Sequence, residues 1–208
     1  LLSQMEIRQA MASTSQPFDW SLLIENPSFE NGFNGWTQSG LALQGNTAFT
    51  LKDGNTYVEK WTGAGNAVGD ASAMQTIKKL GLGVFILKVS AQNIQEGSSV
   101  AQSNTWLIAN ESQTGVNKTQ EYSLTFTNIE YDATIGFKAI GATGNWLACD
   151  NFKLYYAGGG TSDFNTTLQA YIKSAKDCSE KKMNTSIQNT LSSSIAAAEN
   201  ELQNNAIN

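Results

Sequence analysis

A two-residue period in hydrophobicity, which recurs from about residue 20 to about residue 157, constrains the fold of this chain more than any other feature. In "GVFILKVSAQ" apolar side chains occupy every second position from Phe85 to Ala91, and in "EYSLTFTN" they do so from Tyr122 to Phe126. Successive side chains of a strand point to opposite faces of a sheet. The pattern therefore predicts strands that are buried on one face.

Turn-forming Gly, Asn and Asp residues separate these segments at a spacing of roughly ten residues, which is typical of β-sandwiches and barrels. No helical pattern lies between the segments, so the parallel sheet of a βαβ fold is excluded. We therefore expect a mainly β fold with antiparallel sheets that pack as a jelly-roll β-sandwich.

Both ends of the chain have helical patterns instead. Residues 1–14 have a helix-forming composition, and Pro17 disfavours helix in the residue before it. After three glycines and a Thr-Ser-Asp cap signal, two apolar runs follow with helical spacing. We expect an N-terminal helix and linker in residues 1–19, the sandwich in 20–157, and a C-terminal helical hairpin in 158–208. The hairpin is too short to own a core, so it should pack on the first helix, the sandwich or a neighbouring chain.

Charge and composition exclude several classes of function. The formal net charge is −5 and charged residues make up 15% of the chain. Nucleic-acid binding needs clustered Lys and Arg, so we expect no nucleic-acid partner. The absence of histidine excludes Ser-His-Asp triads, Cys-His dyads and His-ligated zinc. No apolar run is long enough for membrane insertion, and the start at Leu1 rather than Met indicates a segment of a longer protein.

The acids and cysteines point to no catalytic chemistry. A glycosidase needs two carboxylates that face each other across a cleft, and no pair of acids here sits in a recognisable catalytic motif. We therefore expect a protein that is not an enzyme. Cys149 and Cys178 are compatible with one disulfide, but two buried thiols are the favoured interpretation because spacing says nothing about distance.

Several motifs resemble those of carbohydrate-binding modules with the galactose-binding-like jelly-roll fold. They are "NPSFE…GW", "WLACDNFKLY", "GNTYVEKW", "GVFILKVSAQN" and "ATGNWLACDNF". The resemblance covers roughly residues 22–157 and is to a variant found, between helical spacers, in secreted polysaccharide-degrading proteins of gut bacteria. It implies a polysaccharide or glycan partner, other domains in the same parent chain, and an extracellular, cell-surface or periplasmic location. The same fold hosts other ligand binders and inert structural modules.

The resemblance also implies a structural calcium ion. In such modules the glutamate of the NPxFE pattern and the aspartate of the last strand often share calcium with backbone carbonyls. Here these residues are Glu30 and Asp150, which would supply part of a shell of about six to eight oxygens. The alternative is that Glu30 caps backbone amides and Asp150 makes a turn bond, without metal. Phe29, Phe33 and Trp36 should pack beneath the sheets.

The candidate ligand site follows from the chemistry of sugars. The C–H face of a pyranose packs on an aromatic ring, and amides or carboxylates hydrogen-bond its hydroxyls. Three of the five tryptophans lie beside glycine-rich loops. The candidate ligand-binding residues are these tryptophans and their polar or aromatic neighbours: Tyr57, Glu59, Trp61, Gln92, Asn93, Trp106, Asn145 and Trp146. A tryptophan in a β-sandwich is more often part of the core, and this interpretation stays open for each ring.

Two functions from different classes remain. The first is a sugar-binding module that anchors a larger protein to its glycan, and it predicts at least two exposed aromatic rings in one depression. The second is a structural spacer with no ligand, and it predicts that Trp61, Trp106 and Trp146 are all buried. The family resemblance favours the first.

Overall fold

The computed structural model describes residues 12–159, 172–173, 176 and 185–205 of the chain. The chain divides into two units, Leu1–Gly158 and Gly159–Asn208. The first unit contains the strands, and the second contains the helix α3, Thr185–Asn205.

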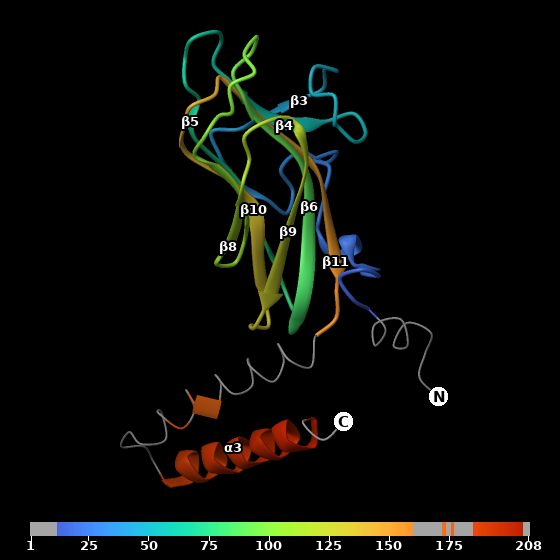
Figure 1. Cartoon of the computed structure of the whole chain (residues 1–208), viewed down its shortest axis with the longest axis vertical. Helices are drawn as coiled ribbons and strands as arrows, with labels where there is room; N and C mark the ends of the chain where they lie inside the picture. The colour runs from blue at the N-terminus through green and yellow to red at the C-terminus, as the bar shows by residue number, and fades with distance from the viewer. Residues whose placement is uncertain (1–11, 160–171, 174–175, 177–184, 206–208) are drawn as a thin grey trace. The chain divides into compact units, whose positions relative to one another are not determined.

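Two antiparallel sheets form the sandwich of the first unit, as the alternation of residues predicts (Figure 1). Sheet A has the order β3-β4-β11-β6-β9, with β1 paired to β11. Its strands are β1 (Phe18–Asp19), β3 (Ala42–Gln44), β4 (Tyr57–Trp61), β6 (Gly83–Ile94), β9 (Gln120–Asn128) and β11 (Trp146–Tyr156). Sheet B has the order β2-β5-β10-β7-β8. Its strands are β2 (Thr37–Ser39), β5 (Gly69–Ile77), β7 (Thr105–Ala109), β8 (Ser112–Gly115) and β10 (Ala133–Ala142).

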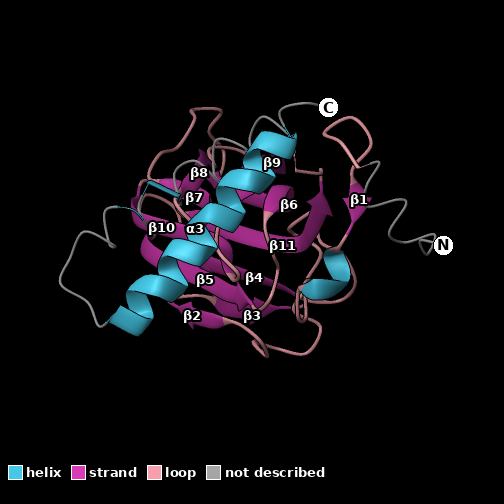
Figure 2. Cartoon of the chain, turned by 90° about the horizontal axis from the view of Figure 1, so that it is seen from below, coloured by secondary structure: helices cyan, strands magenta, loops and turns pink. Residues whose placement is uncertain are grey.

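The hydrophobic core lies between the two sheets, which Figure 2 shows as separate groups of strands. Phe85 and Leu147 enter it from sheet A, and Leu107 and Phe137 enter it from sheet B, all fully buried. On β9 every second residue from Tyr122 is buried and the residues between are exposed, so the expected period is confirmed. Burial of these side chains supplies most of the stability of such a fold.

The segment "NPSFENGFNGW" closes one side of this core. Phe29 is fully buried, with its ring centroid 5.1 Å from that of Trp36 and 6.0 Å from that of Phe152 on β11. The Trp36 indole N–H donates to the Asn26 carbonyl at 3.0 Å. Gly35 has a φ of 81°, and a Cβ there would lie 2.8 Å from the Glu25 Cβ, so this turn requires glycine. The three aromatic rings of the segment therefore serve packing, as expected.

The remaining predictions concern the linker, the cysteines and the terminal helices. Phe18 and Asp19, which the sequence places in the linker, pair with Tyr156 and Tyr155 of β11 as β1, and a 3-10 turn (Ser21–Leu23) follows. Cys149 is a free and fully buried thiol on β11, and burial raises its pKa. The expected N-terminal helix and most of the first helix of the C-terminal hairpin fall outside the described residues, as does Cys178.

The second unit is described chiefly through α3. Ile195 is buried, whereas Ile187 is exposed. An ion pair joins Glu199 of α3 to Lys176. None of the helices in the described part of the chain is long and apolar enough to span a membrane.

Candidate functional site

Trp61 and Trp146 lie side by side on the outer face of sheet A, at one end of the sandwich. Trp61 is the last residue of β4 and Trp146 is the first residue of β11, and the two are directly opposite in the antiparallel register. Directly opposite residues of such a pair share a face, with their Cβ atoms about 5 Å apart. The neighbouring strand β6 adds Ile94, which is opposite Trp146. Two indoles and an isoleucine therefore lie in one row where β4 and β6 end and β11 begins.

A carboxylate holds each of the two indoles. The Trp61 Nε1–H donates to Glu96 Oε2 at 2.6 Å, and the Trp146 Nε1–H donates to Glu59 Oε2 at 2.7 Å. The Trp61 side chain is 58% exposed, whereas Trp146 is half-buried. Asn145 is fully buried and fixes Glu96 in turn, because its Nδ2 donates to Glu96 Oε2 at 3.0 Å and its Oδ1 accepts from the Glu96 amide at 2.8 Å. An exposed aromatic ring is thus held in one orientation. The entropic cost of ordering this side chain when a ligand binds is therefore reduced.

Glu59 is the centre of a second hydrogen-bond network on the same face. Besides the bond from Trp146, its Oε2 accepts from the Tyr57 hydroxyl at 3.0 Å, and its Oε1 accepts from Gln44 Nε2 at 3.1 Å. Tyr57 is fully buried against Phe49, and burial followed by the Glu59 carboxylate raises its pKa. Tyr57 therefore supports the site from below and is not positioned to touch a ligand.

The Gln92 side chain is on the same face of sheet A but is buried there. It is opposite Ala148 in the register and only 2% exposed. Its Oε1 accepts from the Thr119 hydroxyl at 2.8 Å, and its Nε2 has no partner within the described residues. Of the predicted residues, Tyr57, Glu59 and Asn145 connect to Trp61 and Trp146 through hydrogen bonds, and Gln92 lies on the same face of sheet A.

Two predicted residues do not join this group. Asn93 points into the sandwich, where its Nδ2 donates to the Ser103 carbonyl and to the Thr105 hydroxyl, both at 2.9 Å, and it is fully buried. It neighbours Gln92 on one strand, so the two side chains must face opposite ways. Trp106 belongs to β7 of sheet B, where it is opposite Lys138. It therefore lies on the opposite side of the sandwich from Trp61.

Glu96 and Gln44 were missed as members of the site by sequence reasoning. Glu96 lies two residues beyond the end of β6, and that strand ends beside Trp146. A carboxylate directly after a strand that ends next to a tryptophan is a signal that the sequence does contain. Gln44 is on a three-residue strand that no hydrophobic alternation reveals.

We expect Glu96→Ala to release the Trp61 ring. Loss of a bond to a charged acceptor should speed solvent exchange of the Trp61 indole N–H about ten-fold, which corresponds to about 1.4 kcal/mol. The Trp146 indole N–H should be unaffected, because Glu59 holds it. The measurement is hydrogen exchange by NMR, with Glu111→Ala, at an exposed turn, as the control. Equal Trp61 exchange in the wild type and in Glu96→Ala would contradict the bond.

Glu30 and Asp150, the predicted calcium ligands, both hold the loop that precedes β4. Glu30 Oε1 accepts from the amides of Asn55 and Thr56, each at 2.7 Å, and the Thr56 amide is the main cause of its lowered pKa. Asp150 Oδ2 accepts from the Asp53 amide at 2.7 Å. These are the amide-capping contacts of the metal-free alternative, and they tie the first segment and the last strand to one loop.

Asp150 nevertheless has the character of a residue that lacks a counterion. Its Oδ1 is buried without a partner in the described part of the chain. Burial raises its pKa to about 7, and the carboxylates of Asp53 and Glu30 add to this effect. A cation at Oδ1 would supply the missing partner, so Asp150 fits a hard metal ion. Within the described residues no three acidic or cysteine side chains cluster for a metal, so most other ligands would have to be backbone oxygens.

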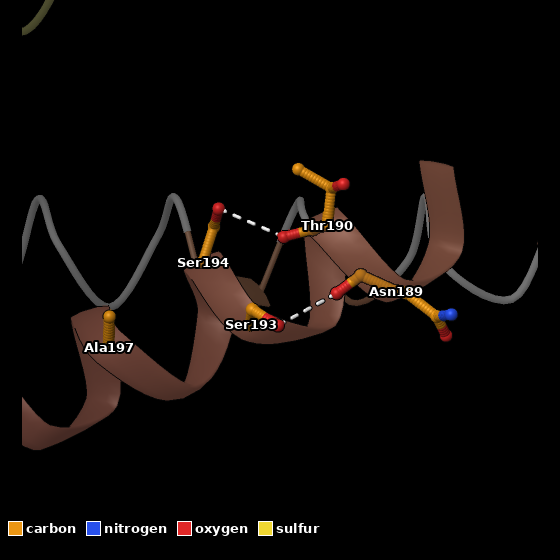
Figure 3. Close-up of a pocket in the computed structure, with 5 residues that line it drawn as sticks. All are labelled: Asn189, Thr190, Ser193, Ser194 and Ala197. Atoms are coloured by element: carbon orange, nitrogen blue, oxygen red, sulfur yellow. Dashed lines mark hydrogen bonds between the residues drawn. The ribbon is translucent and has the colours of Figure 1, made fainter. Parts of the chain in front are cut away.

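A hollow along α3 is lined mostly by polar side chains but offers no charged group. Figure 3 shows the side chains along it: Asn189, Thr190, Ser193, Ser194 and Ala197. The Ser193 and Ser194 hydroxyls donate to the carbonyls of Asn189 and Thr190, at 2.9 and 3.0 Å. Such bonds to the preceding turn satisfy helical hydroxyls internally. We therefore assign this hollow no ligand.

The comparisons with known proteins support the fold. No protein-family model and no curated protein matches the chain. Among solved structures, the chain is similar to TmCBM61 in complex with β-1,4-galactotriose, with a TM-score of 0.50 and 18% identity, over 64% of this chain and 97% of that one. It is also similar to the Stig cyclase Fisc of Fischerella sp. TAU (TM-score 0.49, 13% identity, 69% and 100% covered). A third similar structure is the C-terminal family 22 carbohydrate-binding module of Clostridium thermocellum Xyn10B (TM-score 0.39, 16% identity, 64% and 92% covered).

The first of these similarities means that the chain shares its β-sandwich fold with a carbohydrate-binding module, as the motifs indicated. A shared fold at this level of identity does not fix the ligand, because one fold serves many functions. The function must therefore be argued from the exposed indole and its surroundings.

Proposed function

We propose that the sandwich is a non-catalytic glycan-binding module, and that Trp61 is its principal contact with sugar. The observation that carries the proposal is the exposed Trp61 ring, fixed by Glu96 beside Trp146. A fixed, exposed indole is a suitable platform for the C–H face of a sugar ring. In this role the Glu96 carboxylate accepts hydrogen bonds from sugar hydroxyls, and Trp146 contacts a neighbouring sugar unit.

The exposure of Trp61 also argues against the interpretation of the chain as a structural spacer. It predicts that all three loop-adjacent tryptophans are buried, but Trp61 is 58% exposed. Of the two exposed rings that the sugar-binding interpretation predicts, Trp61 is exposed and Trp146 is half-buried. The exposed ring is held by a 2.6 Å bond from its indole N–H to Glu96, so its face is presented to solvent in one orientation. In the proposed role, the module keeps a larger extracellular, cell-surface or periplasmic protein on its glycan, and weak affinity per site is raised by avidity.

A structural calcium ion is a separate part of the proposal. Asp150 would bind it through Oδ1, and Glu30 would border the site while holding the loop of Asn55 and Thr56. The ion would neutralise the buried carboxylate and fix the loop over sheet A. It takes no part in sugar binding in this proposal.

The experiment is a titration of the protein with neutral oligosaccharides of β-1,4-linked galactose, xylose and glucose, chosen after a glycan array. We expect Trp61→Ala to weaken binding at least ten-fold, about 1.4 kcal/mol or more, as for aromatic residues at the centre of an interface. The matched control is Tyr131→Ala, because Tyr131 is also an exposed aromatic (66%) but lies between β9 and β10. A folded wild type that binds no glycan, or equal losses in both variants, would overturn the proposal.

A further inference from the structure

Sheet B has its own row of side chains, which crosses all five of its strands. Ser39 of β2 is opposite Ser72 of β5, which is opposite Lys138 of β10. Lys138 is opposite Trp106 of β7, which is opposite Gly115 of β8. Directly opposite residues share a face, so the row lies on the outer face of sheet B. Two hydroxyls, an ammonium and an indole are therefore lined up on the side of the sandwich away from Trp61.

A groove of about 170 Å³ lies over the β2 side of this row. Ser39, Ser72 and Lys138 line it, together with Ile140 and Asp70. The register between β5 and β10 shifts after Ala139, and Ile140 at this irregularity is 53% exposed. The groove is several times larger than the about 30 Å³ of one water molecule and smaller than the clefts of drug-sized ligands. Its size therefore suits one small ring.

Several polar groups that line the groove have no partner within the described residues. Lys138 makes no hydrogen bond or ion pair within the described residues, nor do the hydroxyls of Ser39 and Ser72. Asp70 uses Oδ1 to accept from the Gly141 amide at 2.7 Å, which leaves Oδ2 open. The opposite charges of Lys138 and Asp70 offset each other, so the groove suits a neutral ring with hydroxyl donors and acceptors rather than an anion. Trp106, half-buried on β7, is the next residue of the row after Lys138 and does not line the groove.

We propose that this groove is a second sugar-binding site, so that one module can bridge two glycan segments. The groove itself carries the second site; the bridging rests on the proposed function of Trp61. Two weak sites on opposite sides of a rigid sandwich cannot bind one short oligosaccharide together. They would instead join neighbouring chains of a polysaccharide, with a gain from multivalency.

The test is NMR with galactose, glucose and xylose as separate probes. The Trp61 indole N–H reports on the first site, and the backbone amides of Ser72 and Lys138, which line the groove, report on the second. Ser72→Phe should fill the groove, and Lys138→Ala should weaken the second site at least three-fold. Trp61→Ala should abolish the first site alone. Lys118→Ala is the matched control for Lys138, because its exposed ammonium also lacks a partner in the described residues.

Each result has a distinct meaning. Shifts at both reporters in the wild type, with each variant silencing only its own site, would support the bridging module. Shifts at Trp61 alone would overturn the second site and leave the proposed function intact. Shifts at sheet B alone would support the groove but overturn bridging and the role of Trp61. No shift at either reporter would overturn both.

Discussion

Replacing Phe29 by alanine is expected to lower the free energy of unfolding by about 3–5 kcal/mol, the usual cost of removing a buried aromatic ring. Phe29 is fully buried and lies against three other aromatic rings, those of Phe33, Trp36 and Phe152. The loss combines the lost transfer of apolar area with a cavity that these rings cannot fill without leaving their own contacts. Denaturant unfolding followed by circular dichroism measures the effect.

The control for Phe29 is Leu22→Ala in the preceding 3-10 turn. Leu22 is fully exposed, so its replacement should change the free energy of unfolding by no more than about 0.5 kcal/mol. A loss below about 1 kcal/mol in Phe29→Ala would mean that the aromatic cluster does not stabilise this side of the core.

Asp150→Asn is expected to stabilise the metal-free protein at pH 8 by about 1–3 kcal/mol, after allowance for solvent screening and relaxation. The pKa of Asp150 in the folded state is about 7, above its ordinary value of 3.8, chiefly because of burial. The folded state therefore holds this proton more tightly than the unfolded state. Stability should fall as pH rises from about 4 to about 7, since the unfolded chain has already lost the proton. Asparagine loses no proton and can still accept the bond from the Asp53 amide.

The same variant tests the calcium proposal. Thermal unfolding should be measured at pH 5 and pH 8, with a chelator and with millimolar calcium. We expect calcium to stabilise the wild type by about 2–3 kcal/mol when it is present at a hundred times its dissociation constant, and to leave Asp150→Asn unchanged. If calcium does not alter the wild type while the variant is still more stable at pH 8, the carboxylate is simply uncompensated and the metal proposal fails. Equal stability of the two chelated proteins at pH 8 would contradict the raised pKa.

The strands could be predicted from the sequence because their information is local. The alternation from Tyr122 to Phe126 by itself defines the buried face of β9. The pairing of strands is different, because it depends on residues far apart in the chain. Trp61 and Trp146 come together only when β4 pairs with β11, whereas Trp106 lies on β7, which pairs within sheet B. No local pattern around Trp106 distinguishes these outcomes.

Gln92 and Asn93 were both assigned to one site, but the structure places their side chains on opposite faces of β6. Neighbouring residues in a regular strand face opposite sides, so only one of the two amides could reach the outer face. Polarity could not predict which of the two faces outward, because both amides are buried. Asn93 bonds Thr105 between the sheets, and Gln92 bonds Thr119. A sequence alone does not distinguish an amide that is buried and hydrogen-bonded within the protein from an amide that binds a ligand.

The position of β11 determines when this domain can fold during its synthesis. It is the last strand of the sandwich, yet it lies in the middle of sheet A, between β4 and β6. Until residues 146–156 have left the ribosome, β4 and β6 have no common neighbour, and neither Asp53 nor Phe29 has its partner on that strand. A nascent chain that stops before Trp146 would hold the two halves of sheet A unpaired, with open edges that favour aggregation. Assembly of sheet A must therefore wait until this strand has been synthesised.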